Sequence, residues 1–364
     1  MRLELQRRPE RSRVWALLSP LMAVALTVGS AAILLAAFGI DPGRGLYVYF
    51  VEPLTSAWSL QELCVKAAPL VLIAIGLSVC FLSNSWNIGA EGQYIAGAVL
   101  ASWLALAWQD SGGPWLLPAM LILGALGGAL YGAIPALLKI RFGANEILTS
   151  LMLVYVAELG LDYLVRGPWR DPQGFNFPQS VTFNEWATMP LLPGAGRLHL
   201  GVGLALLAAI VATAVLGRTL RGFEVRVVGM APRAARFAGV DDKRMILVTF
   251  LISGALAGLA GIGEVAGPIG QVLPTISPGY GFTAIIVAFL GRLNPVGAVF
   301  AGLLLGLSYM GGEAAQVALG VSSQTTRVFQ GVLLFFVLVC DTLILYRLRF
   351  MRTPAARAAQ LPAR

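Results

Sequence analysis

The stretch GRTLRGFEVRVVGMAPRAARFAGVDDKR, residues 217–244, is the one long charged interruption in a chain built otherwise almost wholly of apolar segments. Seven of its residues are basic, and long apolar runs flank it at 198–216 and 245–263. A charged loop between two apolar spans lies at a membrane surface, and basic residues concentrate on the cytoplasmic side. We therefore predict that residues 217–244 form a cytoplasmic loop of a membrane protein.

A short helix is predicted inside this loop. Pro232 suits the first helical position and Gly239 the position just past a helix end, which frames about two turns. Four alanines at i, i+3, i+4 and i+7 then share one narrow face: Ala231, Ala234, Ala235 and Ala238. Such a short helix is marginal alone in water, so something must hold it. Either this face docks into a groove on a cytoplasmic protein, or the loop is a solvated basic segment that fixes topology.

The composition identifies the class of protein. The chain has 364 residues, of which 57% are hydrophobic and 12% charged, against about 25% charged in a soluble domain. This indicates an integral membrane protein. The net charge of +8 does not predict nucleic-acid binding, because in a membrane chain the position of the charge decides its meaning. Three cysteines without metal-ligand spacing and a single histidine make a metal or haem protein unexpected.

The apolar runs predict about ten transmembrane segments. The first, residues 14–38, is about 25 residues long and reaches roughly 37 Å as a helix. Small residues at 30–32 would suit signal-peptide cleavage, but the run continues to Phe38 without a polar pause, which favours a retained span. The other nine runs are 63–82, 94–108, 115–138, 147–165, 198–216, 245–263, 281–290, 296–310 and 326–346.

The basic residues predict the orientation of these spans. Six of the 26 Lys and Arg residues fall on the outward side, and the rest fall inside. The positive-inside rule then places the N-terminus (1–13), the loop 217–244 and the tail (347–364) in the cytoplasm, and the loop 166–197 outside, folded over the outer mouth. Spans two to five and seven to ten enter from opposite sides, as in an inverted repeat. We expect an all-α, polytopic membrane protein with one transmembrane domain, residues 1–364.

A polar, glycine-rich stretch interrupts the apolar pattern at residues 83–93, SNSWNIGAEGQ. Polar backbone at membrane depth is tolerated only where protein or a water-filled cavity surrounds it. Asn87, Glu91 and Gln93 are therefore candidates to line or frame a solute path. A buried carboxylate is costly without a partner, so Glu91 is expected either in a functional site or in a structural ion pair.

Three further patterns concern helix ends and packing. Asn145 suits the cap of the following span, with Glu146 in its first turn, where the helix dipole favours negative charge. Glycines at every fourth residue predict close helix packing, at 124, 128 and 132 and again at 254 and 258. The run 281–290 is about half the length needed to cross as a helix, which predicts a broken helix followed by a full one.

Four motifs in sequence order carry a resemblance to a known family. They are NIGAEGQ (87–93), GANEI (143–147), FEVRVVGMAPRAARFAGV (223–240) and LGRLNP (290–295). Together they resemble the permease subunits of bacterial ATP-binding cassette (ABC) importers, in the group that carries simple sugars and nucleosides. The resemblance extends over residues 63–343. Leu293 departs from it, because such permeases often have a polar residue there, and this leaves the exact substrate open.

The resemblance implies a function and a set of partners. The chain would form the path for a small polar solute, most simply a nucleoside, in a bacterial inner membrane. Its partners would be a second permease (an identical or a different chain), a cytoplasmic ATPase, an external substrate-binding protein and membrane lipid. ATP would be bound by the ATPase, since the chain has no Gly-x-x-x-x-Gly-Lys-Ser/Thr motif, and the permease would be neither an enzyme nor a nucleic-acid-binding protein.

The resemblance also assigns candidate residues. The substrate-path candidates are Asn87, Glu91, Gln93, Asn145 and Glu146. The residues assigned to ATPase coupling are Arg226, Gly229, Pro232, Ala234, Ala235, Arg236 and Gly239. Helix capping alone would also explain Asn145 and Glu146.

Three alternatives remain open from the sequence. The substrate could be a simple sugar instead of a nucleoside. A cation-coupled secondary transporter could use Glu91, Glu146 and Glu158 as an ionisable relay. A purely structural membrane subunit fits the composition but does not explain the polar stretch at residues 83–93.

Overall fold

The computed structural model describes residues 2–7, 13–192, 194 and 196–351. The chain forms two compact units, one made of residues 1–46 with 322–364 and the other of residues 47–321. Most of the expected cytoplasmic tail, residues 352–364, lies outside the described residues. The described part is predominantly helical, which confirms the predicted all-α membrane fold.

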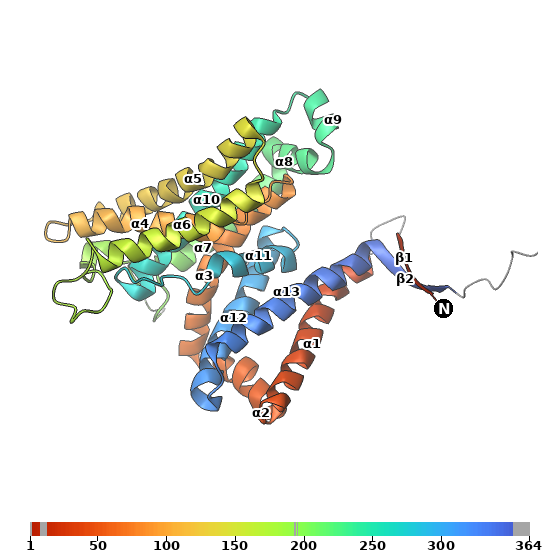
Figure 1. Cartoon of the computed structure of the whole chain (residues 1–364), viewed down its shortest axis with the longest axis horizontal. Helices are drawn as coiled ribbons and strands as arrows, with labels where there is room; N and C mark the ends of the chain where they lie inside the picture. The colour runs from red at the N-terminus through yellow and green to blue at the C-terminus, as the bar shows by residue number, and fades with distance from the viewer. Residues whose placement is uncertain (1, 8–12, 193, 195, 352–364) are drawn as a thin grey trace, which may run out of the picture. The chain divides into compact units, whose positions relative to one another are not determined.

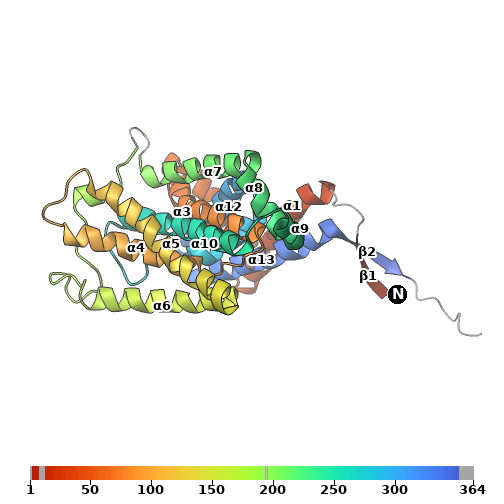
Figure 2. The same cartoon turned by 90° about the horizontal axis from the view of Figure 1, so that it is seen from above.

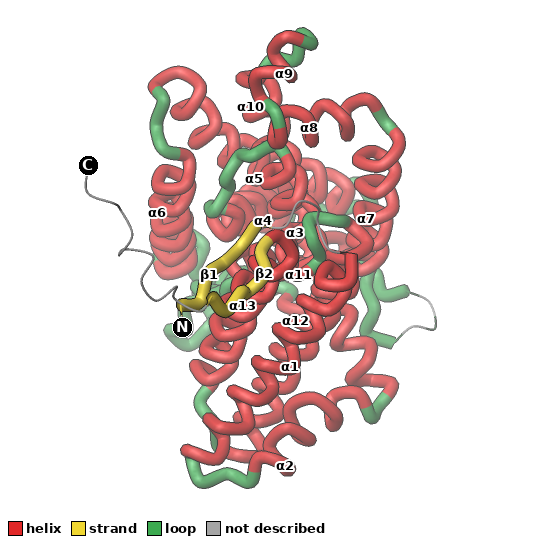
Figure 3. Tube along the Cα trace, turned by 90° about the vertical axis from the view of Figure 1, so that its right-hand side faces the viewer, coloured by secondary structure: helices red, strands yellow, loops and turns green. Residues whose placement is uncertain are grey.

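The smaller unit brings the two ends of the sequence together. The helix α1 (Arg13–Ala37) packs along α13 (Ser323–Leu345), and α2 (Pro42–Leu46) follows α1. These helices match the predicted first and last spans. The strands β1 (Arg2–Arg7) and β2 (Tyr346–Met351) pair antiparallel, drawn in yellow in Figure 3. The hydrophobic periodicity did not predict this strand pair.

The larger unit contains the remaining spans and their connections. It begins with a π-helical turn η1 (Tyr47–Val51) and a 3-10 turn η2 (Glu52–Leu54). The helices follow in the order α3 (Ala57–Leu82), α4 (Ala90–Ala107), α5 (Leu116–Phe142), α6 (Glu146–Arg166), α7 (Leu200–Arg218), α8 (Leu220–Met230), α9 (Pro232–Phe237), α10 (Asp242–Glu264), α11 (Tyr280–Leu290) and α12 (Pro295–Leu319), with the 3-10 turn η3 (Glu185–Ala187) and the π-helical turn η4 (Val265–Ile269) between them.

The helix α3 forms the centre of the larger unit. Beyond Lys66 it holds no charged residue, and every residue from Ala67 to Phe81 is buried. The helices α7, α10, α11 and α12 all pack on it. A helix that is apolar all round must be covered on every side, and α3 is covered by its own chain. It continues through Pro69, so the proline does not interrupt the span.

The outer helices of the larger unit lie on opposite sides of this centre. Figure 2 shows α6 along one side and α7 along the other, with α3, α4, α5 and α10 between them. Within the described residues, six helices are long and apolar enough to cross a membrane: α3, α5, α6, α7, α10 and α12. The helix α11 is short, with 11 residues, as the sequence predicted, and α12 begins five residues after it ends.

Glycines bring α4, α5 and α10 into backbone contact. A Cβ placed on Gly128 of α5 would lie 2.1 Å from the Gly254 carbonyl oxygen of α10. A Cβ on Gly258 would lie 2.0 Å from the Gly124 carbonyl oxygen, and one on Gly97 of α4 would lie 2.3 Å from the Gly258 Cα. Small residues at such crossings let helices pack closely in lipid. The predicted packing role of these glycines is confirmed.

The long connection between α6 and α7 folds back onto the chain. Its backbone amides donate hydrogen bonds to the segment after α10, from Ser180 to the Val272 carbonyl (2.9 Å) and from Met189 to the Ala266 carbonyl (2.7 Å). His199 then caps α7, because its Nδ1 accepts a hydrogen bond from the Gly201 amide. Burial, and to a lesser degree the Arg197 charge, lowers the pKa of His199, which keeps Nδ1 available as an acceptor. The connection between α6 and α7 is therefore held against the protein.

The two principal loops lie at opposite ends of the larger unit. In Figure 1, α8 and α9 stand at one end of the helices, and the connection between α6 and α7 lies at the other end. Which of the two ends faces the cytoplasm stays a prediction.

The glycine contacts give a stability prediction. Gly258→Ala should destabilise the protein by about 1–3 kcal/mol, because the new methyl group overlaps the Gly124 carbonyl and the helices must separate. The measurement is the thermal unfolding midpoint of the purified protein in detergent. Gly263→Ala is the matched control on the same helix, since a Cβ there meets nothing within 4 Å. Equal midpoints for the two variants would show that the α5–α10 contact does not limit stability.

Candidate functional site

The chain between α3 and α4 is not helical, and its polar groups are bonded inside the protein. The Ser83 hydroxyl donates to the Cys80 carbonyl (2.8 Å), and the Ile88 amide donates to the Ser150 hydroxyl of α6 (3.2 Å). Gly89 lies against α6 so closely that a Cβ would be 2.6 Å from the Ser150 carbonyl oxygen. Most of the predicted polar interruption is therefore surrounded by protein, as membrane depth requires, and Asn84 and Trp86 are its exposed residues.

Two buried amide side chains form a clamp across this region. Asn87 Nδ2 donates to Gln93 Oε1 (2.8 Å), and Gln93 Nε2 donates back to Asn87 Oδ1 (3.0 Å). Asn87 also donates to the Ser253 hydroxyl of α10 (3.0 Å) and accepts from the Gly89 amide (3.1 Å). These bonds use both donors and both acceptor positions of the Asn87 amide. Asn87 and Gln93 therefore join α4, α10 and the interruption, and their place on the substrate path stays a prediction.

Glu91 holds the start of a second helix. Its side chain is 3% exposed, and its Oε2 accepts a hydrogen bond from the Gly281 amide of α11 (2.5 Å). Ser277 supports the same turn, because its hydroxyl accepts from the Gly279 and Tyr280 amides. Amides in the first turn of a helix have no partner within it, and the positive end of the helix dipole favours a carboxylate. The partner found for Glu91 is thus a helix terminus and not the ion pair that was one of the two expectations; the other, a functional site, stays a prediction.

Gly281 has no room for a side chain at this contact. A Cβ there would lie 2.3 Å from the Glu91 amide nitrogen and 2.6 Å from its Cα. The N-terminal ends of α4 and α11 therefore meet in backbone contact. Two interrupted helices that meet near the middle of a membrane protein are typical of transport sites.

Three tyrosines extend from this junction. Tyr280 makes edge contacts with Tyr94 (ring centroids 6.3 Å apart) and with Tyr309 (5.4 Å). The Tyr309 and Thr283 hydroxyls share a hydrogen bond of 2.8 Å. The tyrosine rings are buried, so they connect α4, α11 and α12 into one packed block.

The capping interpretation of the GANEI motif is confirmed. Asn145 Oδ1 accepts hydrogen bonds from the Ile147 and Leu148 amides (2.9 and 3.3 Å), which are in the first turn of α6. Glu146 forms an ion pair with Lys139 near the end of α5. These contacts fix the turn between α5 and α6. They give both residues a structural role, and their inclusion as path candidates stays a prediction.

The side of α6 that faces away from the protein carries polar residues. Tyr155, Glu158, Asp162 and Arg166 follow at three- and four-residue spacing and so share one side, and their side chains are exposed or half exposed. Asp162 pairs with Arg166 at 2.7 Å. We call these four residues the α6 polar stripe. At 1.5 Å per residue, Glu158 lies about 18 Å along a helix of about 31 Å, which places a carboxylate near mid-membrane.

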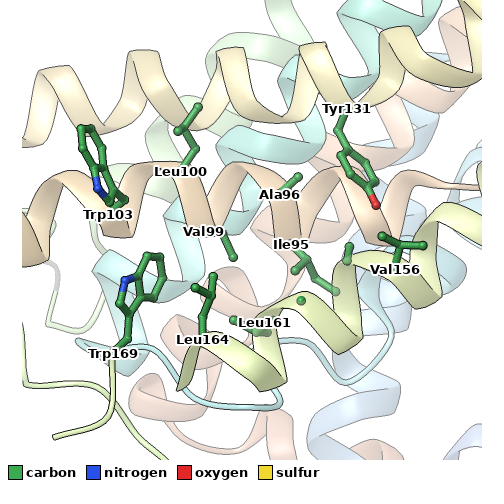
Figure 4. A pocket seen from close by; sticks show the side chains of 12 residues that line it. Ile95, Ala96, Val99, Leu100, Trp103, Tyr131, Val156, Leu161, Leu164 and Trp169 are labelled. Atoms are coloured by element: carbon green, nitrogen blue, oxygen red, sulfur yellow. The ribbon is translucent and has the colours of Figure 1, made fainter. Parts of the chain in front are cut away.

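The other flank of α6 borders an apolar groove. Figure 4 shows this groove, with a volume of about 540 Å³, between α4, α5 and α6. Ile95, Leu161 and Leu164 line it, with Trp103 and Trp169 at one end. Its lining contains no charged side chain. A polar solute needs hydrogen-bond partners to be recognised, so the groove of Figure 4 is not suited to one.

The loop at the other end contains two helices packed on one small core. The helix α9 spans Pro232–Phe237, and Gly239 follows its end at φ +82°, as predicted. Ala235 is fully buried among Val225, Val228 and Met245. The partner that holds this short helix is therefore the chain itself, through α8 and the start of α10. The sequence did not predict α8.

Only one residue of the predicted alanine face is buried, whereas Ala231, Ala234 and Ala238 are exposed, and docking of this face on an ATPase stays a prediction. Ala235 faces inward, whereas Ala234 and Arg226 are exposed, and Arg236 pairs with Asp242 at 2.5 Å. Gly229 allows close packing, because a Cβ there would lie 2.0 Å from the Leu82 carbonyl oxygen at the end of α3. The outward apolar side chains of α8 and α9 are Leu220, Phe223, Met230 and Phe237, and Phe237 is 95% exposed. A docking partner would contact these four side chains, and the buried Ala235 would stabilise the packing of the helices that carry them.

Comparison with known proteins identifies the family. Residues 59–338 match the family model described as "Branched-chain amino acid transport system / permease component". The matched region includes the interruption, the α6 polar stripe and the loop with α8 and α9. The chain is a member of this permease family.

Named relatives of this permease transport different solutes. It is 37% identical to the glucose ABC transporter permease protein of Haloferax volcanii, over 95% of this chain and 94% of the relative. It is 31% identical to the guanosine ABC transporter permease protein of Bacillus subtilis (89% and 94% covered) and 29% identical to a nucleoside ABC transporter permease protein of Lactococcus lactis (88% and 90%). This permease is thus a multi-pass membrane subunit of the ABC type, which in general works with an ATPase and a substrate-binding protein.

For the long-range contacts of the permease, the sequence identified one partner and not the other. It selected Asn87, Glu91 and Gln93, but their partners Ser253 and Gly281 lie more than 150 positions away in the sequence. The α6 polar stripe was missed as a site, although its spacing was readable, because Glu158 was considered only as a member of a relay.

The contact at Glu91 gives a prediction for the permease. Glu91→Ala should lower both solute uptake and the thermal unfolding midpoint, because the Gly281 amide would stay buried without a partner at a cost of about 1–3 kcal/mol. Glu91→Gln keeps an acceptor oxygen, so it should retain most of the stability. The measurements are uptake in cells with matched expression and thermal unfolding in detergent. An alanine variant that matches the wild type in both would rule out a role for this contact.

Proposed function

We propose that this permease carries a nucleoside across a bacterial inner membrane, and that the α6 polar stripe lines its path. The observation that carries the proposal is the exposed carboxylate of Glu158 near mid-membrane. A charged group is costly in hydrocarbon, so such residues face a water-filled cavity or another protein. The two nucleoside-transporting relatives support the substrate class.

The stripe has the chemistry that a nucleoside requires. The Glu158 and Asp162 carboxylates accept hydrogen bonds from ribose hydroxyls, and Tyr155 offers a ring face to the base as well as a hydroxyl. Polar groups spaced from Tyr155 to Arg166 also allow successive weak contacts, which a solute needs if it is to leave again. The clamp at Asn87 and Gln93 frames this path by fixing α4, on which α6 packs.

A simple sugar is the second candidate. The relative with the highest of the three identities is a glucose permease, and carboxylates bind sugar hydroxyls as well as they bind ribose. The two candidates differ in the base, which needs an aromatic or apolar surface that a sugar does not.

The relay of a cation-coupled transporter is less consistent with the geometry. Glu146 is paired with Lys139, and Glu91 is bound to the start of α11. Glu146 and Glu158 are 12 residues apart on one helix, about 18 Å. Coupling to ATP hydrolysis through a separate ATPase remains the proposal.

The proposed coupling element is the outer surface of α8 and α9. We place residues 217–244 and both chain ends in the cytoplasm, and residues 166–197 outside, on the positive-inside rule. A cytoplasmic ATPase then docks on the exposed residues around Phe237 and Met230. A second permease, of the same or a different sequence, completes the path opposite α6, and an external binding protein delivers the solute.

A variant on the stripe tests the function. Glu158→Gln should lower uptake of radiolabelled guanosine or uridine about tenfold or more, because hydrogen bonds to a charged acceptor contribute about 1.5–3 kcal/mol. The thermal unfolding midpoint should not change, since the side chain is exposed in the chain. Glu185→Gln, an exposed carboxylate in the connection before α7, is the matched control.

The same uptake assay separates the alternatives. Uptake should require ATP and persist with an uncoupler, and unlabelled nucleoside should compete better than glucose. Collapse of uptake by the uncoupler alone would favour the secondary transporter. Stronger competition by glucose would favour the sugar. Wild-type nucleoside uptake by Glu158→Gln would remove the stripe from the path.

A second variant tests the coupling surface. Phe237→Glu places a charge on the most exposed side chain of α9, where a disrupted interface contact costs about 2 kcal/mol or more. It should abolish uptake and co-purification of the ATPase, while the unfolding midpoint of the permease stays unchanged. Ala235→Glu would be a poor test, because it buries a charge in the loop's own core.

Phe175 provides the control at the opposite end of the protein. It is 93% exposed in the connection before α7, and Phe175→Glu should leave the ATPase bound. Cysteines at the same two positions test the orientation: an impermeant thiol reagent added outside should label Phe175→Cys and not Phe237→Cys. Retention of the ATPase by Phe237→Glu, or the reverse labelling pattern, would refute this assignment.

A further inference from the structure

A second cavity lies on the side of the permease away from α6. It has a volume of about 810 Å³, within the range of about 300–1,000 Å³ typical of ligand sites. Its walls are α7, with Val211, Ala212 and Val215, and α10, with Val248 and Ile252, and its floor is α3, with Ile75 and Val79. The cavity exists because α7 packs mainly on α3 and α12 and makes few contacts with α10.

The depth of this cavity matches one leaflet of a bilayer. Its lining runs from Leu216 to Ala208 along α7 and from Met245 to Leu256 along α10. At 1.5 Å per residue these stretches are about 12 and 16 Å long, roughly half of the hydrocarbon thickness of about 30 Å. The cavity begins at the end that carries α8 and α9 and ends near the middle of the membrane.

The two ends of the cavity differ in chemistry. The deep part is lined by aliphatic side chains and Thr249, whereas the mouth is lined by Arg221, Arg244, Glu224 and Asp241. Both arginines extend into solvent, with weak pairs to Glu224 (3.0 Å) and Asp241 (3.7 Å). The loop around the mouth holds seven basic and three acidic residues, so its field is positive. This arrangement suits a ligand with an anionic head and a long apolar tail.

The outer face of α7 also indicates lipid. Its exposed side chains include Leu206, Leu207, Ile210 and Val211, and its sequence from Leu200 to Leu216 holds no charged residue. The α6 side, by contrast, exposes the Glu158 carboxylate near mid-membrane among apolar side chains such as Leu159. The α7 side is therefore suited to hydrocarbon, and the cavity opens between two helices on that side.

We propose that this cavity binds an anionic phospholipid of the leaflet next to α8 and α9, with an acyl chain between α7 and α10 and the phosphate at Arg221 and Arg244. Arginine binds phosphate oxygens through paired N–H donors, and basic groups near a membrane surface attract anionic lipids. The bound lipid fills the space between the coupling helices and the membrane helices. The identification of this leaflet as the cytoplasmic one rests on the orientation proposed above, whereas the proposal that the cavity binds a lipid does not depend on that orientation.

Native mass spectrometry of the full-length permease in detergent tests the proposal. Phosphatidylglycerol should bind more tightly than phosphatidylethanolamine with the same acyl chains. The double variant Arg221→Gln/Arg244→Gln should reduce phosphatidylglycerol binding about tenfold or more, since each basic group contributes about 1 kcal/mol. Arg226→Gln/Arg233→Gln removes the same charge from exposed positions of the same loop that do not line the cavity, and should have little effect.

A second pair of variants tests the acyl-chain site. Ala212→Trp fills the cavity and should abolish tight binding, while Ala214→Trp on the same helix, outside the lining, should not. Equal binding of the two lipids would overturn the headgroup assignment. Equal losses in the two arginine pairs would show nonspecific attraction to the loop, and unchanged binding in Ala212→Trp would show that no acyl chain enters.

Discussion

Backbone polar groups at membrane depth must form hydrogen bonds inside the protein. The larger unit is arranged around two places where a helix is interrupted and its backbone groups need other partners. The chain leaves its helical path at residues 83–89, and α11 begins as a short helix within the membrane region. The Asn87–Gln93 amide clamp stabilises the first, and the Glu91 carboxylate stabilises the second. Because Glu91 belongs to the helix that the clamp also holds, the two interruptions are tied together by α4.

The close packing of α4, α5 and α10 follows from the same constraint. The clamp reaches Ser253 on α10 through a side-chain bond of 3.0 Å, so α10 must pass close to α4. Gly97, Gly128 and Gly258 permit that approach, since any side chain there would overlap a neighbouring backbone. These glycines therefore have two roles: they allow the contacts that support the interruption, and they let the helices associate closely in lipid.

The sequence predicted elements better than it predicted their partners. Apolar run length placed the spans, and local chemistry identified the Asn145 cap and the helix between Pro232 and Gly239, because each depends on residues a few positions apart. The burial of Ala235 inside its own chain was not predicted, for the opposite reason. Small size at i and i+4 shows that something approaches closely, but does not show whether it is another protein or α8 and Met245 of the same chain. Gly281 and Ser253 were missed because their roles depend on residues far away in sequence.

The contact between the loop and the interruption connects the two proposed sites. Gly229 of α8 packs on the Leu82 carbonyl, Leu82 belongs to the cluster around Ala235, and the interruption begins at the next residue. A rigid displacement of α8 and α9 therefore cannot occur without moving the end of α3, the start of α10, or both. The clamp joins the interruption to α10 and α4, and α6 packs on α4 through Ser150 and Val154. If an ATPase docks on the proposed coupling surface, this continuous set of contacts would connect it physically to the polar stripe, whereas a solvated loop would have no such connection.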